Sequence, residues 1–260
     1  MSGPGGGGRH DDAPSPTGPV RLAMWSGPRN ISTAMMRSWE NRSDSLVVDE
    51  PLYAHYLAAT GIDHPGREEV LAAGETDWRR VVADLLGPVG PRVRVFYQKH
   101  MTHHLVADVE HGWIPELHHV LLTRDPREVV ASYIRSRATV GPDDIGLPQQ
   151  VRLYDELVDS GATPLVIDAA DFLRAPELYL RALCDRLGLP FEAGMLSWPP
   201  GRRDTDGVWA PYWYAAVEAS TGFEPRRERD VHLPREAAEV AETCLPMYER
   251  LHAVRWLPGA

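Results

Sequence analysis

The chain has 260 residues, a formal net charge of −10, 43% hydrophobic residues and 25% charged residues. This length can bury a full hydrophobic core, and the acidic balance argues against nucleic acid as the main partner. Its two cysteines, Cys184 and Cys244, are too few for a disulfide framework or a CxxC metal site.

Residues 1–19 are rich in Gly, Pro, Ser and Asp and contain no apolar core of signal-peptide length. A segment of this composition buries too little apolar surface to fold, which predicts a disordered tail. No later apolar run approaches the roughly 20 residues that a membrane-spanning helix needs. We therefore expect a cytoplasmic protein with no membrane contact and a single α/β domain over residues 20–260.

The stretch Arg21–Arg37 contains a short apolar run, a Ser26-Gly27-Pro28 turn and the start of a helix expected over Ile31–Asn41. A strand, a tight turn and a helix in succession point backbone N–H groups and a helix N-terminus at an anion. Four hydrogen-bond donors lie where that anion would sit: Arg29, Asn30, Ser32 and Thr33. The same pattern also fits an ordinary turn in which Ser32 or Thr33 caps the helix.

A second buried strand is expected at Leu46–Val48, ending at Asp49-Glu50-Pro51. Pro51 favours an extended backbone at Glu50, so this carboxylate is expected at the carboxyl end of a strand. Ligands of open α/β sheets bind at that edge. Either acid would equally serve to complement the positive end of a following helix.

The alternating segment Arg92–Gln98 predicts a third strand, which runs into Lys99-His100-Met101-Thr102-His103-His104. The histidines lack the helical spacing and the carboxylate of a typical zinc site, so no metal is expected. Lys99 and His100 at a strand end suit charge stabilisation and proton transfer. A histidine in this place is also commonly a hydrogen-bonded structural group.

A fourth strand is expected at His118–Thr123, with Arg124 at its junction to a helix. Asp125 before Pro126 is typical of an N-cap followed by proline at the first helical position. The sequence also predicts a short strand at Pro164–Asp168. Helices are expected in pieces over Tyr53–Leu86 and at Pro148–Ser160, Pro176–Leu187 and Pro234–Arg255. Strands that alternate with helices indicate a three-layer α/β fold with a central parallel sheet flanked by helices.

Together, the junctions Ser26–Thr33 and Thr123–Tyr133 resemble the PAPS-dependent sulfotransferase family, a branch of the P-loop nucleotide-binding fold. The second resembles the family's 3′-phosphate segment, in which a serine follows an arginine by eight positions, as Ser132 follows Arg124. The first resembles its 5′-phosphosulfate loop, which implies donor contacts from Gly27, Pro28, Arg29, Asn30, Ile31, Ser32 and Thr33.

Further along the chain, the Gly201–Trp209 loop resembles the segment that closes on the 3′-phosphate in this family, which implies a contact from Arg202 or Arg203. Ala34 stands where an aromatic residue often stacks on adenine, so adenine must be held elsewhere, with Trp209 as a candidate. Arg29 stands where the family usually has lysine. Arginine does not readily give up a proton, which favours an electrostatic role.

The resemblance implies transfer of a sulfuryl group from PAPS to a hydroxyl or amine of a small organic acceptor, releasing adenosine 3′,5′-bisphosphate. As in phosphoryl transfer, the protein aligns the reactants and neutralises the leaving oxygens. Glu50 matches the position of a catalytic glutamate in some branches, whereas Lys99-His100 resembles the Lys-x-His element of others. We favour Glu50 as the base, with Lys99 and His100 near the transferring group. Glu50 needs desolvation to raise its pKa for this role, whereas histidine does not.

Two other functions remain open. A small-molecule kinase is disfavoured because the chain has no GxxxxGK[ST] motif. A catalytically inactive nucleotide-binding regulatory protein is kept open by Arg29 and Ala34, the two departures from the family pattern. Six aromatic residues suit an apolar acceptor pocket: Tyr53, Tyr56, Trp209, Tyr212, Trp213 and Tyr214.

Overall fold

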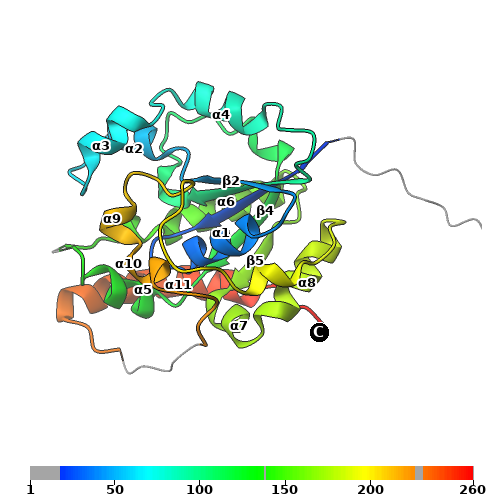
Figure 1. Ribbon diagram of the computed structural model, residues 1–260. Helices are drawn as coiled ribbons and strands as arrows, with labels where there is room; N and C mark the ends of the chain where they lie inside the picture. Colours follow the sequence, from blue (N-terminus) through cyan, green and yellow to red (C-terminus); the bar gives the residue numbers. More distant parts are fainter. Residues whose placement is uncertain (1–17, 138, 226–230, 260) are drawn as a thin grey trace, which may run out of the picture.

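A computed structural model of the chain describes residues 18–137, 139–225 and 231–259 (Figure 1). Five strands form a parallel sheet in the order β2-β3-β1-β4-β5. Their bounds are β1 Val20–Ser26, β2 Ser45–Asp49, β3 Val95–Met101, β4 His118–Thr123 and β5 Leu165–Asp168. The predicted central parallel sheet is confirmed.

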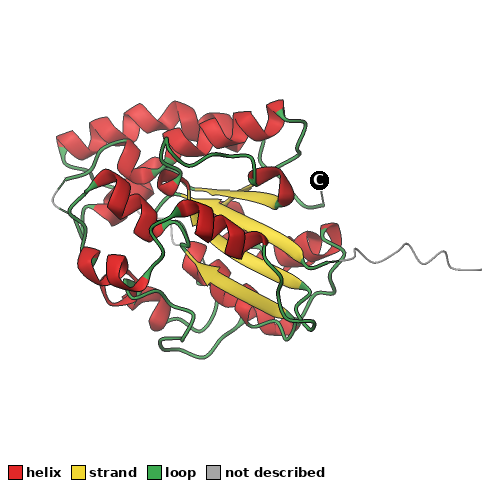
Figure 2. Ribbon diagram, turned by 90° about the horizontal axis from the view of Figure 1, so that it is seen from above, coloured by secondary structure: helices red, strands yellow, loops and turns green. Residues whose placement is uncertain are grey.

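Helices cover both faces of the sheet (Figure 2). The α-helices are α1 Ser32–Glu40, α2 Tyr53–Thr60, α3 Arg67–Ala73, α4 Trp78–Leu86, α5 Pro126–Tyr133, α6 Leu147–Asp159, α7 Ala169–Arg174, α8 Pro176–Arg186, α9 Ala210–Trp213, α10 Ala215–Glu218 and α11 Arg235–Ala253. Short 3₁₀ turns are η1 Thr102–His104, η2 Ile114–Glu116, η3 Asp143–Ile145 and η4 Ala193–Leu196.

The central strand β1 is buried on both sides and divides its side chains between two cores. Leu22 and Met24 pack with α1, α7 and α8, whereas Ala23 and Trp25 pack with α4, α5, α6 and α11. Successive residues of a strand point to opposite faces, so a nearly continuous apolar run supplies both cores. This is the three-layer arrangement expected from the sequence.

The third strand ends later than its sequence pattern suggested. β3 continues to Met101, because it pairs with β1 up to Met101 and with β2 up to Lys99. Lys99 and His100 therefore belong to the strand itself and point to opposite faces of the sheet. Lys99 shares its face with α1, and His100 lies in the core on the other side.

The extended backbone expected at Glu50 is wrong, because Glu50 has a positive φ of 42° just after the end of β2. The expected start of the helix after Arg124 is confirmed. The Asp125 side chain accepts a hydrogen bond from the Arg127 N–H at 2.9 Å, and Pro126 begins α5. The predicted tail, residues 1–19, lies outside the described residues except for its last two. Within the described ranges, none of the helices has the length and apolar character required to cross a membrane.

The strand order brings the two strand–helix junctions to the same edge of the sheet. β1 lies next to β4. The chain leaves β1 towards β2 at one edge of the sheet, whereas it leaves β4 in the opposite direction, towards β5. In open α/β sheets, a crevice forms outside the carboxyl ends of the strands where the order reverses in this way. The loop after β1 and the loop after β4 both lie at this crevice.

A close backbone approach fixes the start of the loop after β1. The Thr102 hydroxyl donates to the carbonyl oxygens of Ser26 at 3.2 Å and Gly146 at 2.9 Å. Gly27 lies directly against this junction, and a Cβ atom there would be 2.1 Å from the Ile145 carbonyl oxygen. Any residue with a side chain at position 27 would therefore collide with the backbone of Ile145.

We predict that Gly27→Ala lowers the free energy of unfolding by about 1–3 kcal/mol, because the added methyl group collides with the backbone at Ile145. Gly112→Ala is the matched control, since no atom lies within 4 Å of a Cβ at Gly112. Its effect should stay within about 0.5 kcal/mol. Urea denaturation of both variants measures the difference, and equal stabilities would contradict the close approach.

Candidate functional site

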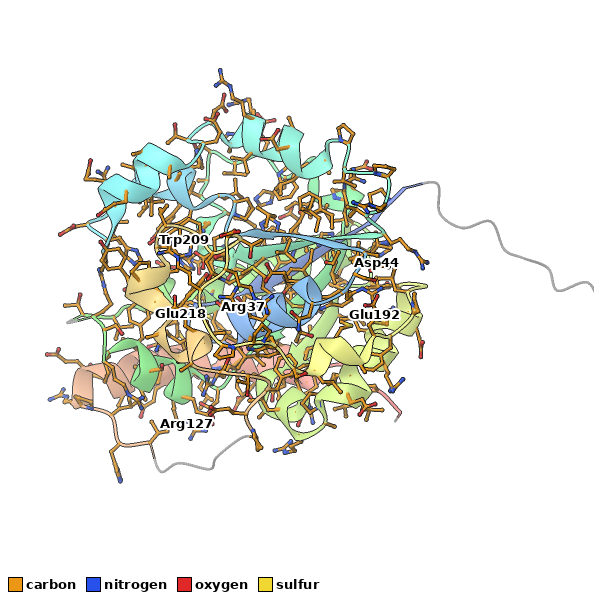
Figure 3. The ribbon with its side chains drawn as sticks, viewed as in Figure 1. Arg37, Asp44, Arg127, Glu192, Trp209 and Glu218 are labelled. Atoms are coloured by element: carbon orange, nitrogen blue, oxygen red, sulfur yellow. The ribbon has the colours of Figure 1, made fainter. Side chains whose placement is uncertain are left out.

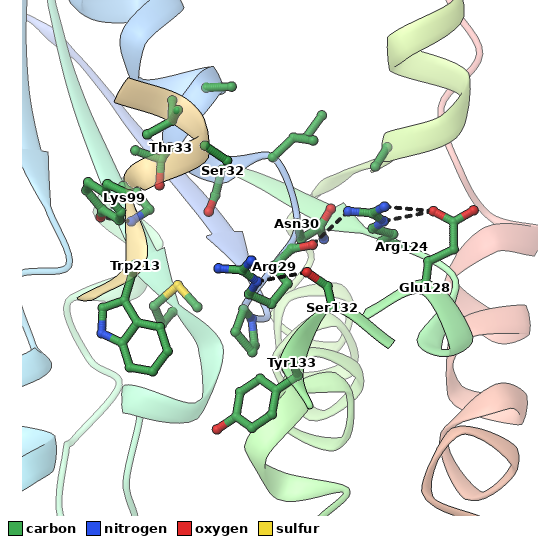
Figure 4. Close-up of a pocket in the computed structure, with 18 of the residues that line it drawn as sticks. Arg29, Asn30, Ser32, Thr33, Lys99, Arg124, Glu128, Ser132, Tyr133 and Trp213 are labelled. Atoms are coloured by element: carbon green, nitrogen blue, oxygen red, sulfur yellow. Dashed lines mark hydrogen bonds and ion pairs between the residues drawn. The ribbon is translucent and has the colours of Figure 1, made fainter. Parts of the chain in front are cut away.

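A cavity of about 550 Å³ opens at the carboxyl edge of the sheet (Figure 4). Its walls come from the loop after β1, the end of β3, α5, the start of α7 and residues 213–225. Of the loop residues singled out from the sequence, those from Pro28 to Thr33 line it, together with Glu50, Lys99, Arg124 and Ser132. Gly27 lies behind this wall, against Ile145.

The loop after β1 has an unusual backbone. Arg29 and Ile31 have positive φ angles of 57° and 38°. Such angles are rare for residues other than glycine, especially β-branched ones, and they persist where surrounding contacts fix the chain. One such contact is the 2.6 Å hydrogen bond that Asn30 donates to the Leu122 carbonyl oxygen, which ties the loop to β4.

The first turn of α1 faces the cavity without a side-chain cap. Its N-cap residue is Ile31, which makes no capping hydrogen bond, so the alternative in which Ser32 or Thr33 caps the helix is not found. Both of these residues instead line the cavity. Free N–H groups at a helix N-terminus, combined with the helix dipole, form a binding site for an anion.

The two strand–helix junctions contact each other directly. Arg29 Nε donates to Ser132 Oγ at 2.9 Å, and Arg124 Nη1 donates to the Arg29 carbonyl oxygen at 2.9 Å (Figure 4). Arg124 also forms an ion pair with Glu128, at 2.9 Å between Nη2 and Oε2. Arg135 lines the same region. Burial, followed by repulsion from Arg135 and Arg124, lowers the pKa of Arg29. An anion bound here would relieve that repulsion.

A buried ionic network lies on the opposite side of the cavity. Lys99 Nζ contacts Asp49 Oδ1 at 2.8 Å, Glu50 Oε1 at 2.6 Å and the Tyr214 hydroxyl at 2.6 Å. The Tyr214 hydroxyl also contacts Asp49 Oδ2 at 2.6 Å. Burial raises the pKa of Glu50, although Lys99 acts in the opposite direction. The desolvation needed for a glutamate base is therefore present.

Aromatic rings form the wall beside Glu50. Tyr53 stacks on His104 with ring centroids 4.8 Å apart, and its hydroxyl hydrogen-bonds His64, whose ring lies 5.2 Å from that of Trp213. Burial lowers the pKa of His64 to about 4 and the pKa of His103 to about 3. Both histidines are therefore neutral at pH 7. This wall can accommodate an uncharged ring.

The expectation that His100 lies near the reacting group is not met. His100 is buried, stacks on Trp25 with centroids 4.2 Å apart and hydrogen-bonds Gln98 at 3.2 Å. Burial lowers its pKa to about 3. The strand alternation explains this position, since it directs Lys99 towards the cavity and His100 into the opposite core.

The Gly201–Trp209 loop lies outside the cavity lining as well. Arg203 bonds Asn41 Oδ1 at 2.9 Å and pairs with Glu40, and the side chain of Arg202 is exposed. Trp209 donates to the Tyr214 hydroxyl at 3.1 Å and packs edge-on against Tyr53. None of these three residues lines the cavity, and their expected nucleotide contacts stay a prediction.

The same loop fastens the outer side of α1 to the rest of the fold. Arg37 Nη2 contacts Asp206 Oδ2 at 2.6 Å, and both side chains are almost fully buried. Figure 3 shows Arg37 pointing from α1 towards the loop that leads to Trp209. Arg37 and Arg203 thus have protein partners that fasten α1 to this loop.

Several lining residues were not singled out from the sequence as site residues. His64, Asp144, Leu173, Val217 and Phe223 all line the cavity. The apolar ones lie at the end formed by α7 and residues 216–224. A signal for α7 was present, because Asp168, the last residue of β5, is a typical N-cap residue and accepts hydrogen bonds from the Ala170 and Asp171 N–H groups.

A family model and two solved structures both relate this chain to sulfotransferases. The family model described as "Sulfotransferase domain" matches residues 20–255. Two solved structures match at 15% and 14% identity: the sulfotransferase domain of the Synechococcus PCC 7002 olefin synthase and a sulfotransferase from Alicyclobacillus acidocaldarius. Their TM-scores are 0.50 and 0.51. The matches cover 88% and 91% of this chain, and 96% and 97% of the matched chains. The two structures therefore share the fold of this chain.

Two curated relatives come from Arabidopsis thaliana. They are branched-chain-amino-acid aminotransferase-like proteins 1 and 2, with 38% identity over 238 residues and 37% over 231 residues. The matches cover 90% and 88% of this chain but only 42% and 41% of the relatives. The chain therefore spans about two-fifths of the length of these relatives.

Lys99, the only lysine in the sequence, offers a direct test of the buried network. Although burial opposes its charge, the carboxylates of Asp49 and Glu50 raise its pKa well above the usual value. We predict that an amine-acylating reagent modifies Lys99 in the folded protein more slowly than in guanidinium chloride by about two orders of magnitude or more, because a core group reacts only when the structure opens. Peptide mass spectrometry measures both rates, and comparable rates would contradict the network.

Proposed function

The chain belongs to the sulfotransferase family, and we propose that it transfers a sulfuryl group from PAPS to a hydroxyl or amine of a small organic acceptor, releasing adenosine 3′,5′-bisphosphate. The observation that carries this proposal is the direct contact between the two strand–helix junctions. Arg29 bonds Ser132, and Arg124 bonds the backbone of Arg29, each at 2.9 Å. These contacts support the proposal, because they hold the residues proposed for the 5′-phosphosulfate and those proposed for the 3′-phosphate next to each other.

In this proposal, the loop Gly27–Thr33 and the uncapped first turn of α1 bind the 5′-phosphosulfate. Arg124 and Ser132 bind the 3′-phosphate, the group that distinguishes PAPS from ATP. Glu128 already pairs with Arg124 at 2.9 Å, so the phosphate shares or replaces that partner. Arg29 lies between the two regions and neutralises the charge that develops on the departing phosphate.

Glu50 is the proposed base. The acceptor hydroxyl or amine gives its proton to the Glu50 carboxylate, while the acceptor atom forms a bond to sulfur. The bond between sulfur and the bridging phosphate oxygen breaks, and adenosine 3′,5′-bisphosphate keeps the electron pair. The raised pKa of Glu50, caused mainly by burial, makes it a stronger base than an exposed carboxylate.

The cavity also offers places for adenine and for the acceptor. Leu173, Val217 and Phe223 form an apolar end near the start of α7, which suits a nucleobase. At the other end, the rings of Tyr53, His104 and Trp213 border Glu50, which suits a small ring-bearing acceptor. Adenine binding at the α7 end replaces the expected contact with Trp209.

An aminotransferase role for this chain is not favoured, although the plant relatives carry that word in their names. Aminotransferases that use pyridoxal phosphate need a lysine amine that forms a Schiff base. Lys99 is the only lysine in the sequence, and its ammonium is buried between two carboxylates. That environment keeps it protonated.

We predict that adenosine 3′,5′-bisphosphate, at ~100 times its dissociation constant, stabilises the protein by about 2.7 kcal/mol in a thermal unfolding experiment. Arg124→Ala and Ser132→Ala should reduce this shift, because each removes a 3′-phosphate contact. Arg127→Ala is the control, since Arg127 pairs with Asp125 on the exposed side of α5.

ATP and ADP are tested alongside the bisphosphate. A shift with ATP and none with the bisphosphate would favour the kinase alternative. Binding of the bisphosphate without turnover of PAPS, across a broad panel of alcohols, phenols and amines, would favour the inactive regulatory protein.

For turnover, we predict that Glu50→Gln lowers kcat by about 10²–10⁴-fold while the affinity for adenosine 3′,5′-bisphosphate stays unchanged, because the amide cannot accept the proton. Glu69→Gln is the control, since Glu69 is an exposed carboxylate whose contact is the Tyr212 hydroxyl at 3.3 Å. Steady-state release of the bisphosphate measures both. Turnover of Glu50→Gln within a few-fold of the unaltered protein would remove Glu50 from the base role.

A further inference from the structure

Two consecutive carboxylates contact the same buried ammonium. Asp49 and Glu50 lie 2.8 and 2.6 Å from Lys99 Nζ, and the Lys99 side chain is 1% exposed. Neighbouring residues of an extended strand point to opposite faces, so this convergence requires a change in the backbone. The arrangement is therefore a specific feature of the end of β2.

The backbone at Glu50 supplies that change. Asp49 is the last residue of β2 and pairs with Lys99 in the sheet register. Glu50 then adopts a positive φ of 42°, and its N–H donates to the Lys99 carbonyl oxygen at 2.9 Å. This conformation is unfavourable for a residue other than glycine, and such strain is concentrated at functional sites. It turns the Glu50 side chain back onto the face that carries Lys99.

We propose that Asp49 is a positioning residue whose negative charge balances the positive charge of Lys99. Lys99 can then orient the Glu50 carboxylate and still leave it able to accept a proton. This inference rests on the proposed role of Glu50. Asp49 itself is too deep to touch the acceptor, with a side chain 2% exposed against 12% for Glu50. Its effect on the reaction passes through Lys99.

The charges around Lys99 support this division of roles. In a buried site, an ammonium paired with Glu50 alone would hold that carboxylate firmly in its ionised form and make it a poor proton acceptor. Asp49 supplies the compensating negative charge. The Tyr214 hydroxyl donates a hydrogen bond to Asp49 Oδ2 at 2.6 Å, whereas Glu50 is the carboxylate of the two that lines the cavity.

The other groups facing Glu50 do not supply this balance. Tyr214 contacts Glu50 Oε1 at 3.5 Å, and Tyr53 faces it from α2. Burial, followed by repulsion from Glu50, raises the pKa of Tyr53, so it remains a neutral phenol. Burial lowers the pKa of His104, so it remains a neutral imidazole. The ionic balance at Glu50 is thus set by Asp49 and Lys99.

The test compares two substitutions with opposite electrostatic effects. Asp49→Asn removes a negative charge that raises the pKa of Glu50, so the acidic limb of kcat/KM against pH should move to lower pH, with a several-fold loss of kcat at the plateau. Lys99→Met removes the positive charge that lowers the pKa of Glu50, so the limb should move to higher pH. Asp84→Asn, at an exposed position of α4, is the control and should leave the limb unchanged.

A second readout does not depend on turnover. Infrared difference spectra between each protein and its Glu50→Gln counterpart report the protonation of the Glu50 carboxyl group as pH is varied. The midpoint should fall in Asp49→Asn and rise in Lys99→Met relative to the unaltered chain. Circular dichroism and binding of adenosine 3′,5′-bisphosphate establish that each variant is folded. This spectroscopic measurement remains valid if one variant is too slow to assay.

The outcomes separate this inference from the proposed function. If Glu50→Gln abolishes turnover but the limb and the infrared midpoint do not move in Asp49→Asn, Asp49 has only a structural role and the inference is overturned. The inference is also overturned if the acidic limb and the infrared midpoint shift in the same direction in Asp49→Asn and in Lys99→Met. Full activity of Glu50→Gln, by contrast, rejects the base assignment itself, and with it the role of Asp49.

Discussion

The side chain of Arg29 joins the two halves of the site. It extends from the loop after β1 to Ser132 on α5, while Arg124, at the end of β4, bonds the Arg29 backbone. These contacts are possible only because β1 and β4 are neighbours in a parallel sheet and therefore end at the same edge. The positive φ of Arg29, the close approach at Gly27 and the uncapped start of α1 all belong to the same local arrangement.

Charge divides the cavity into two ends. Arg29, Arg124 and Arg135 line one end, where they repel one another and suit a polyanionic donor. At the other end, the ammonium of Lys99 is taken up by Asp49 and Glu50, and the neighbouring histidines are held neutral by burial. A donor at the cationic end and an uncharged acceptor at the aromatic end would meet beside Glu50, where the Lys99 and Glu50 side chains are 1% and 12% exposed and charges act more strongly than in water.

The sequence was most informative where local chemistry determines the structure. The apolar runs gave the five strands, and Asp125-Pro126 gave the start of α5. Long-range contacts could not be read in this way. β3 extends to Met101 because two neighbouring strands pair with it, and this extension moved His100 into the core. The contacts of Arg203 with Glu40 and Asn41, on and just after α1, had no local signal either. Tyr214, 115 residues beyond Lys99, had no local signal for its role.

The most direct test of the account is a calorimetric comparison of adenosine 3′,5′-bisphosphate with adenosine 5′-phosphate, since these two ligands differ only in the 3′-phosphate. If Arg124 and Ser132 form the site for that group, the bisphosphate should bind at least ~10-fold more tightly, because a charge-assisted hydrogen bond contributes about 1.5–3 kcal/mol. The advantage should vanish when both residues are replaced by alanine. Equal affinities for the two ligands in the unaltered protein would contradict the assignment of this cavity as a PAPS site.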